Sequence, residues 1–398
     1  MSAPRDEIET DDVEEWFEQE DNVPVEPVLA PMDPAEKYAK SQLRVVRETK
    51  DYQLDYLQHA LQPGRELIDI SPAYQRRLRW GNRKKSLLIE SLLLNIPVPP
   101  IFLFERDYNE YEVIDGRQRL DAISSFLSND YPLTGLEYWP ELNRNRFLDL
   151  PAILQKGLLR RSLPAVVLLA ESQSPGSDGL DVRRVLFDRL NTGGIRLNPQ
   201  ELRNALYPGQ FNAMLIGLAR SRPFTEIWGI PPYVVGEELE PSDALLRNAI
   251  FASLADAELV LRFFALRDAV EKNKSGSLRT ILDRFMESQS SVGESGVEAM
   301  QTQFTQVLTR LRSVFGEVTF RLKDRGRLSR PLYDALMIAL SQDPTIDVES
   351  NAVSIRQALD QALGDEDAYE ILVGRGNTIA AVHERVALAK TILTTETR

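Results

Sequence analysis

The chain has 398 residues, of which 43% are hydrophobic and none is cysteine. This length is typical of two or three domains. The lack of cysteine excludes disulfide frameworks, cysteine zinc sites and thiol chemistry. The first residues, MSAPRDEIETDD, lack the basic-then-apolar pattern of a signal peptide. No apolar run approaches the roughly 18 residues of a membrane span, so we expect a cytoplasmic protein without a membrane segment.

The negative charge of the chain is concentrated at its N-terminus. Residues 1–36 contain thirteen acidic residues and one arginine, a net charge of −12, whereas the whole chain carries −13. The body of the protein is therefore close to neutral. High charge and few aliphatic residues predict a disordered acidic tail at residues 1–38. Because Trp16 and Phe17 lie within this tail, a second interpretation stays open, in which the segment docks on a basic groove of this chain or of a partner.

Strand and helix signals are mixed up to about residue 212. Helical spacing of apolar residues predicts helices, and short apolar runs bounded by turn residues predict strands. In chain order we expect a helix at 52–61, a short strand at 66–70, a helix at 86–94, a hairpin of 101–104 with 111–114, a helix at 119–127, a strand at 164–170 and a helix at 181–190.

Strand signals nearly vanish after residue 212. Amphipathic segments with helical spacing follow at 244–273, 278–288, 297–315, 330–341, 352–363 and 379–394. The sequence therefore predicts an α+β protein in three parts. These are the acidic tail at 1–38, an α/β domain at 39–212 and an all-helical domain at 213–398.

The first stretch that suggests chemistry is Asp115-Gly116-Arg117-Gln118-Arg119, between a predicted strand and a predicted helix. Gly116 permits an unusual backbone angle and a close ligand. A helix start attracts anions, and the forked donors of arginine match phosphate oxygens. A carboxylate such as Asp115 beside a phosphate most often holds Mg²⁺ or positions a water. A purely structural interpretation is also open, in which Asp115 caps the helix and the arginines pair with nearby carboxylates.

A second stretch is strongly basic. Residues 72–85 contain six basic residues and no acidic one, with two aromatic residues interleaved. Such a mixture suits nucleotides or nucleic acid, and the alternative is a solvated basic face with Trp80 in the core. The candidate nucleotide contacts are Tyr74, Gln75 and Arg76. The candidate nucleic-acid contacts are Arg77, Arg79, Trp80, Arg83, Lys84 and Lys85.

A third stretch, FDRLNTGGIRLNPQEL at 187–202, contains a polar turn flanked by arginines. Arg189 and Asn191 are candidates for a second wall of an anion site. The alternative is a helix that ends at Gly193, followed by a new helix that starts at Asn198-Pro199.

Several familiar motifs are missing from the sequence. It has no GxxxxGK[ST] phosphate loop, and its two histidines, His59 and His383, are far apart. A His-Asn-His nuclease or another histidine-based metal nuclease is therefore not expected in this chain.

The three stretches, in this order, resemble the N-terminal domain of GmrSD-type modification-dependent restriction systems. The hallmark of that family is a DGQQR box, which matches Asp115, Gly116, Gln118 and Arg119 and departs at Arg117. AYQRRLRWGNRKKSLLIESLLLNIPVPPIFLF and FDRLNTGGIRLNPQEL are similar to the segments before and after the box. With AELVLRFFAL and LRTILDRFM, the likeness covers most of residues 65–290.

The resemblance implies a ParB/sulfiredoxin-like α/β fold for the domain that carries the box. It also implies that this domain binds and hydrolyses nucleoside triphosphates (NTPs) and gates a separate nuclease or effector in anti-phage defence. Arg119 would then hold phosphates, and Asp115 would bind Mg²⁺ or the attacking water. Gln118 would be a further catalytic residue that supplies a neutral hydrogen-bond donor and acceptor. Arg117 either tightens phosphate binding or pairs with Asp115 and weakens hydrolysis.

Two functions therefore remain open at the level of the sequence. One is an NTP-hydrolysing sensor subunit of a defence system, with NTP and Mg²⁺ as cofactors. The other is an adaptor that binds nucleotide or DNA without turnover. Expected partners are an NTP, a nuclease or effector protein, DNA as a further candidate, and a second copy of the chain. An acidic tail that covers the basic 72–85 segment would be autoinhibitory.

Overall fold

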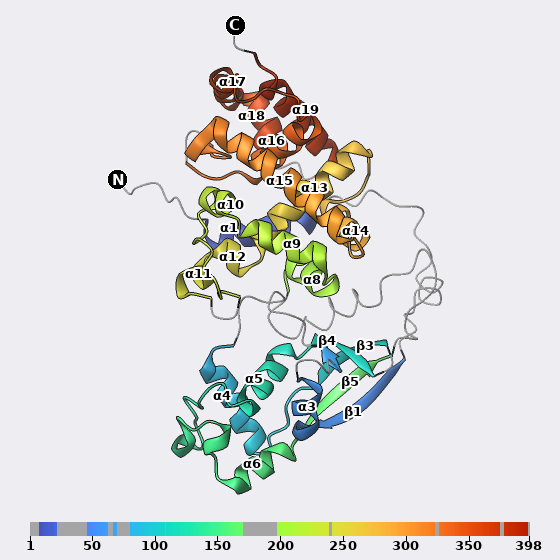
Figure 1. The fold of residues 1–398 in the computed structure, drawn as a ribbon, viewed down its shortest axis with the longest axis vertical. Coiled ribbons are helices and arrows are strands. Elements are labelled where there is room, and N and C mark those ends of the chain that lie inside the picture. The colour runs from blue at the N-terminus through green and yellow to red at the C-terminus, as the bar shows by residue number, and fades with distance from the viewer. Residues whose placement is uncertain are drawn as a thin grey trace. The chain divides into compact units, whose positions relative to one another are not determined.

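The computed structural model describes residues 8–21, 46–62, 67–69, 80–107, 109–169, 197–238, 241–322, 326–374 and 378–396. They form two compact units (Figure 1). The sheet unit contains all five strands and the helices between them. The helical unit contains the N-terminal helix and the described residues from Asn198 onward. The expectation of a mixed α/β protein with many helices is thus confirmed at this level.

The sheet unit is built on a five-stranded mixed sheet in the order β1-β5-β3-β4-β2. The strands are β1 (Arg47–Gln53), β2 (Ile68–Asp69), β3 (Ile101–Asp107), β4 (Glu110–Asp115) and β5 (Ser162–Leu168). β3 and β4 form the predicted antiparallel hairpin, and β5 runs parallel to β3. β1 pairs with β5 at the edge of the sheet. Its sequence, RETKDYQ, is too charged to give a strand signal, which is why the sequence did not predict it.

Helices pack on one face of this sheet (Figure 1). They are α3 (Leu54–Ala60), α4 (Asn82–Leu93), α5 (Arg117–Leu127) and α6 (Ala152–Leu159). Alternate strand residues such as Leu103, Val113 and Val167 form a buried core with the apolar faces of these helices, including Ile89 and Ile123. Every second residue of the strands and the residues on one face of each helix, which recur every 3.6 positions, contribute to this core.

The helical unit contains α1 (Thr10–Asp21), α8 (Pro199–Leu206), α9 (Gln210–Ala219), α10 (Arg222–Trp228), α11 (Asp243–Arg247), α12 (Ala249–Ala252), α13 (Ala255–Glu271), α14 (Leu278–Ser288), α15 (Glu294–Phe315), α16 (Arg330–Gln342), α17 (Ala352–Gly364), α18 (Glu366–Val373) and α19 (Ile379–Leu393). The predicted helix at 244–273 is divided into three, because Asn248 caps α12 and Leu254 adopts a φ of 61°. Within the described ranges, no helix is both long and apolar enough to cross a membrane.

The core of the helical unit contains buried ion pairs. Arg262 on α13 lies against Asp334 on α16, with its Nε 3.2 Å from Oδ1, and both side chains are buried. Arg203 on α8 contacts Asp283 at 2.7 Å and Glu258 at 3.3 Å. These pairs join helices that are distant in sequence, so the packing of the unit depends on matched charges as well as apolar contacts.

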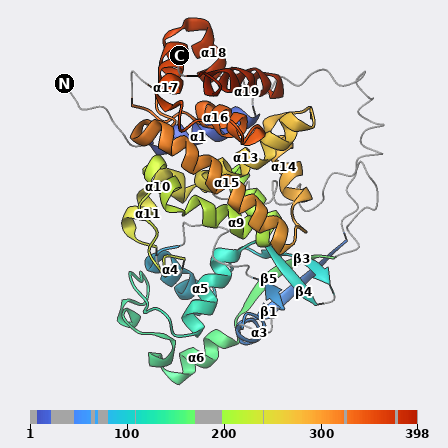
Figure 2. The ribbon, with the colours of Figure 1, turned by 45° about the horizontal axis from the view of Figure 1, so that its top comes forward.

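The predicted disorder of the acidic tail is wrong for its first described part. Residues 10–21 form α1, which lies among the helices of the helical unit (Figure 1 and Figure 2). Its side chains Val13, Trp16 and Phe17 are buried in the core of that unit. The sequence did not predict this helix, because its many carboxylates give the segment the composition of a disordered tail although it has an apolar stripe at helical spacing. Residues 22–38 lie outside the described residues.

The division between the units differs from the expected boundary at residue 212. That position lies inside α9, and the C-terminal segment of the helical unit begins at Asn198. α8 and α9 pack against α13, so they belong with the later helices.

The buried pair of Arg262 and Asp334 is expected to contribute strongly to stability. Arg262→Met should lower the free energy of unfolding by about 3–5 kcal/mol, because it leaves a buried carboxylate without its counter-charge. The measurement is urea unfolding followed by circular dichroism at 222 nm. Arg267→Met is the control on the same helix. It removes a half-exposed pair with Glu271 and should cost about 0–1 kcal/mol. Equal effects of the two substitutions would contradict the prediction.

Candidate functional site

The turn between β4 and α5 carries the DGRQR stretch. Asp115 is the last residue of β4, Gly116 is the N-cap of α5 and Arg117 is its first residue. Gly116 has a φ of 98°, and a Cβ atom at this position would lie 2.8 Å from Ile101 Cβ and 3.1 Å from Arg119 Nη2. Only glycine fits this position. Other residues rarely adopt this φ angle, and Ile101 and Arg119 fill the space that a side chain would need.

An ion pair spans this turn. Arg119 Nη2 lies 2.7 Å from Asp115 Oδ2, and Arg119 Nη1 donates to the Pro99 carbonyl at 3.2 Å. The Arg119 side chain is 12% exposed and that of Asp115 is 37% exposed. Asp115 thus pairs with Arg119; pairing of Asp115 with Arg117 was one of two alternatives that the sequence left open. Arg119 ties the turn to the segment before β3, and the Asp115 carboxylate stays accessible to solvent.

α4 and α5 lie side by side and run in the same direction. At their N-terminal ends, the backbone N–H of Trp80 donates to Gln118 Oε1 at 3.1 Å. Further along, Lys85 Nζ lies 2.8 Å from Asp121 Oδ2 and 3.5 Å from Ser125 Oγ. The residue numbers increase in the same direction along both helices, so the helices are parallel. Their two N-termini, each with a positive dipole end, therefore meet at one place.

The charges at this place are the reverse of those that helix starts usually carry. α4 and α5 each have a glycine N-cap, Gly81 and Gly116, that supplies no side-chain cap. Neither helix has an acidic residue in its first turn. Their first turns instead contain basic residues, which are unfavourable beside a positive dipole end by about 0.3–1 kcal/mol each. A bound anion would relieve this repulsion.

The described basic residues of this region differ in their surroundings. Arg83 is exposed and lies 3.7 Å from Glu137, while Lys84 Nζ lies 4.6 Å from the centre of the Trp80 ring. Lys85 is mostly buried, with its Nζ paired to Asp121 and 5.4 Å from the centre of the Tyr131 ring. Lys85 thus joins α4 to α5, and Arg83 and Lys84 remain at the surface.

The sequence did not identify Glu90 as a residue that supports this region. Glu90 is buried on α4, and its carboxylate accepts hydrogen bonds from the backbone N–H groups of Glu137, Tyr138 and Trp139 at 2.8–3.1 Å. It anchors the loop after α5 against α4 and so fixes the spacing of the two helices. A single acid within the apolar run SLLIESLLL was the available signal.

Seven of the predicted site residues lie outside the described residues. They are Tyr74, Gln75, Arg76, Arg77, Arg79, Arg189 and Asn191. The helix start that we considered at Asn198-Pro199 is confirmed, since Asn198 caps α8 and its side chain accepts from the backbone N–H of Glu201 at 2.9 Å.

No cluster of three or more acidic, histidine or cysteine side chains suited to a metal ion occurs in the described part of the chain. Mg²⁺, however, is often bound by one or two carboxylates together with substrate phosphates. Asp115 is compatible with that mode, provided that its carboxylate exchanges Arg119 for the metal.

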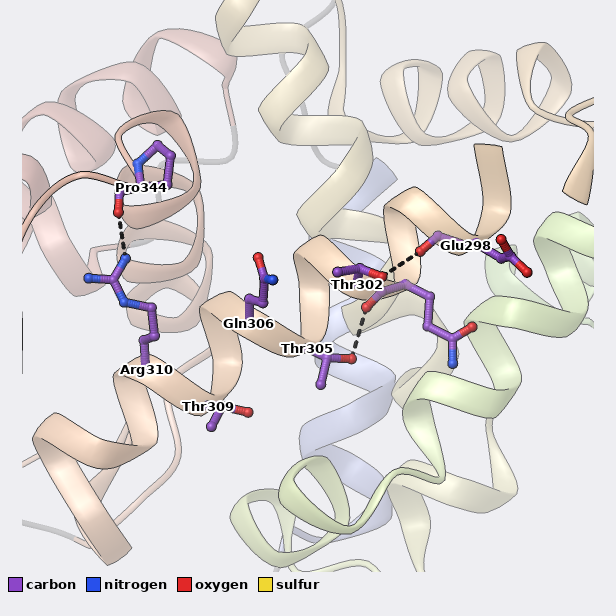
Figure 3. A pocket seen from close by; sticks show the side chains of 8 residues that line it. Glu298, Thr302, Thr305, Gln306, Thr309, Arg310 and Pro344 are labelled. Atoms are coloured by element: carbon purple, nitrogen blue, oxygen red, sulfur yellow. Dashed lines mark hydrogen bonds between the residues drawn. The ribbon is translucent and has the colours of Figure 1, made fainter. Parts of the chain in front are cut away.

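The helical unit has a surface hollow of its own along α15 (Figure 3). Its lining is polar, with Thr302 and Thr305 donating to carbonyls of their own helix. Arg310 is held by Glu349 and by the Pro344 carbonyl, at 2.8 and 2.9 Å. These side chains are occupied by intramolecular bonds, so the hollow lacks the cluster of basic side chains that marks the helix starts of the sheet unit.

Comparison with known proteins gives one match. Residues 57–208 match the family model described as the GmrSD restriction endonuclease, N-terminal domain. This range contains the DGRQR turn and the whole of α4, α5 and α8. Neither the curated proteins nor the solved structures contain a match.

Gly116 is expected to be essential to the turn. Gly116→Ala should lower the free energy of unfolding by about 1–3 kcal/mol, because alanine is strained at this φ and its Cβ meets Ile101. The matched control is Gly157→Ala within α6, where a Cβ meets nothing within 4 Å and where alanine should stabilise the helix by about 0.5–1 kcal/mol. Thermal unfolding of both variants tests this. A Gly116→Ala protein as stable as wild type would show that the turn tolerates a side chain.

Proposed function

We propose, because residues 57–208 match the model of the GmrSD N-terminal domain family, that this protein is the NTP-binding, regulatory component of a restriction-type defence system. The match supports the restriction context. The binding of an NTP is our inference from the geometry of the DGRQR turn.

The observation that carries the proposal is the meeting of two parallel helix N-termini. α4 and α5 start beside each other at glycine caps, and their first turns contain basic and no acidic residues. Two dipoles and several cations at one point match the charge of a polyphosphate. Arg117, Arg119, Arg83 and Lys84 are the described side chains that would contact it.

We further propose that the site hydrolyses the NTP. Asp115 is suited to holding Mg²⁺ or orienting the attacking water, and Gln118, bonded to the Trp80 backbone, lies in the same first turn. Mg²⁺, when bound, would neutralise charge on the phosphates. The mixed sheet followed by this turn and helix is compatible with the ParB/sulfiredoxin-like fold that the family resemblance implies.

A second candidate is a nucleotide- or DNA-binding adaptor without turnover. The pair of Asp115 with Arg119 favours it, because Mg²⁺ would have to compete with the Arg119 guanidinium for the Asp115 carboxylate. In either case we propose that a separate nuclease or effector performs any DNA cleavage.

Phosphate release from each of the four NTPs with Mg²⁺ tests the first candidate. Asp115→Asn and Arg119→Ala should each lower the rate at least about 100-fold. Asp115→Asn removes the carboxylate charge beside the reacting phosphates, and Arg119→Ala removes a hydrogen-bond donor to them. Lys156→Ala on α6 is the control, since it removes an exposed charge from the same unit and should leave the rate unchanged.

Calorimetric titration with a non-hydrolysable NTP separates the two candidates. Binding together with turnover supports the hydrolase, and binding without turnover in the wild-type chain supports the adaptor. A folded wild-type protein that neither binds nor hydrolyses any NTP would refute the nucleotide site.

A further inference from the structure

α1 packs against a part of the protein that is remote in sequence. It is followed by residues 22–45 and then by the sheet unit, yet it belongs to the helical unit and packs against α12 and α14 (Figure 1 and Figure 2). A segment at one end of the chain thus closes over helices formed by the other end.

The contact surface of α1 is an apolar stripe. Val13, Trp16 and Phe17 have the i, i+3, i+4 spacing of one helix face and are 2%, 9% and 7% exposed. The Trp16 ring meets the edge of Trp228 on α10, with 6.1 Å between ring centres and an interplanar angle of 79°. The helices of the helical unit therefore provide an apolar surface against which α1 is buried, and we call this surface the groove.

Charged groups fix the position of α1 in this groove. Arg330, at the start of α16, donates through Nη1 and Nη2 to the Trp16 carbonyl, each at 3.1 Å. Its guanidinium carbon also lies 5.3 Å from the centre of the Trp16 ring. At the start of α1, Asp12 forms an ion pair with Arg327. Basic residues of the groove thus contact an acidic helix.

α1 is a poor helix by itself. It has twelve residues, seven of them acidic, and no basic residue in its last turn. A helix this short is marginal in water, and like charges at i and i+4, such as Asp11 with Glu15, destabilise it further. Its C-terminal acids also oppose the helix dipole. The helical conformation of α1 therefore depends on the groove, so docking and folding of α1 are coupled.

We propose that the helical unit contains a binding groove for an acidic amphipathic helix, and that α1 is its releasable intramolecular ligand. The groove recognises an aliphatic residue followed three and four positions later by two aromatic residues, on a helix whose carboxylates meet Arg327. A partner protein that presents such a helix would displace α1. Because α1 belongs to the same chain as its groove, it is present there at a high effective concentration, so α1 blocks the groove until a stronger ligand arrives.

A labelled peptide of residues 8–21 tests this proposal on the full-length protein, with fluorescence anisotropy as the measurement. The chain with Trp16→Ala and Phe17→Ala should bind the peptide, because its own α1 no longer fills the groove. The wild-type chain should bind it roughly 100-fold more weakly, since the tethered helix competes. The control chain carries Glu14→Ala and Glu15→Ala, on the exposed face of α1, and should bind the peptide no more tightly than wild type.

The ion pair of Asp12 and Arg327 provides a specificity test. A peptide with Asp12→Arg should bind the Trp16→Ala, Phe17→Ala chain more weakly, and addition of Arg327→Asp to that chain should restore binding. If the Trp16→Ala, Phe17→Ala chain does not fold, the milder full-length Asp12→Arg variant takes its place as the receptor for the wild-type peptide. A folded Trp16→Ala, Phe17→Ala chain that binds no peptide would show that α1 is a permanent part of the core. Equal binding by this chain and wild type would show that α1 does not compete with the peptide, and either result would overturn the proposal.

Discussion

The close contact between Gly116 and Ile101 is the constraint on which the candidate site depends. The backbone at residue 116 turns with a positive φ directly against β3, so α5 starts at the end of β4 without an intervening loop. This places the Arg119 guanidinium within reach of both Asp115 and the Pro99 carbonyl. The parallel start of α4 is then set by Gln118 and by the pairing of Lys85 with Asp121. A side chain at residue 116 would disturb each of these contacts.

The two units use their basic residues in different ways. In the helical unit, Arg203, Arg262 and Arg330 are buried and matched to carboxylates or carbonyls of other helices, so they serve packing. In the sheet unit, basic residues gather at helix starts where the protein supplies no acid in the first turn. Charge that is unfavourable to the isolated fold is typical of a ligand site. The basic residues of the DGRQR region therefore differ in their surroundings from the buried, paired arginines of the helical unit.

The sequence predicted the helices and strands whose apolar residues recur with a clear period. It missed those in which charged residues obscure that period. The β3–β4 hairpin, α5, α14 and α16 were expected near their observed positions, because their apolar residues recur at the period of the element. β1 and α1 were not predicted, since strands and helices rich in charged residues look like surface loops or disordered tails. Both elements are stabilised by partners far along the chain, β1 by β5 and α1 by the helical unit.

The sequence by itself determined the mixed α/β class of the protein, the likeness of residues 57–208 to a family model and the residues of the DGRQR turn, because these depend on local patterns of residue type. Only the tertiary structure decided that Asp115 pairs with Arg119, that α4 and α5 start together, that Glu90 holds the neighbouring loop and that α1 lies in a groove of the helical unit. Each of these features joins segments whose distance in space depends on how the whole chain packs, or depends on a side-chain direction that the backbone sets. Residue order alone does not specify such distances and directions.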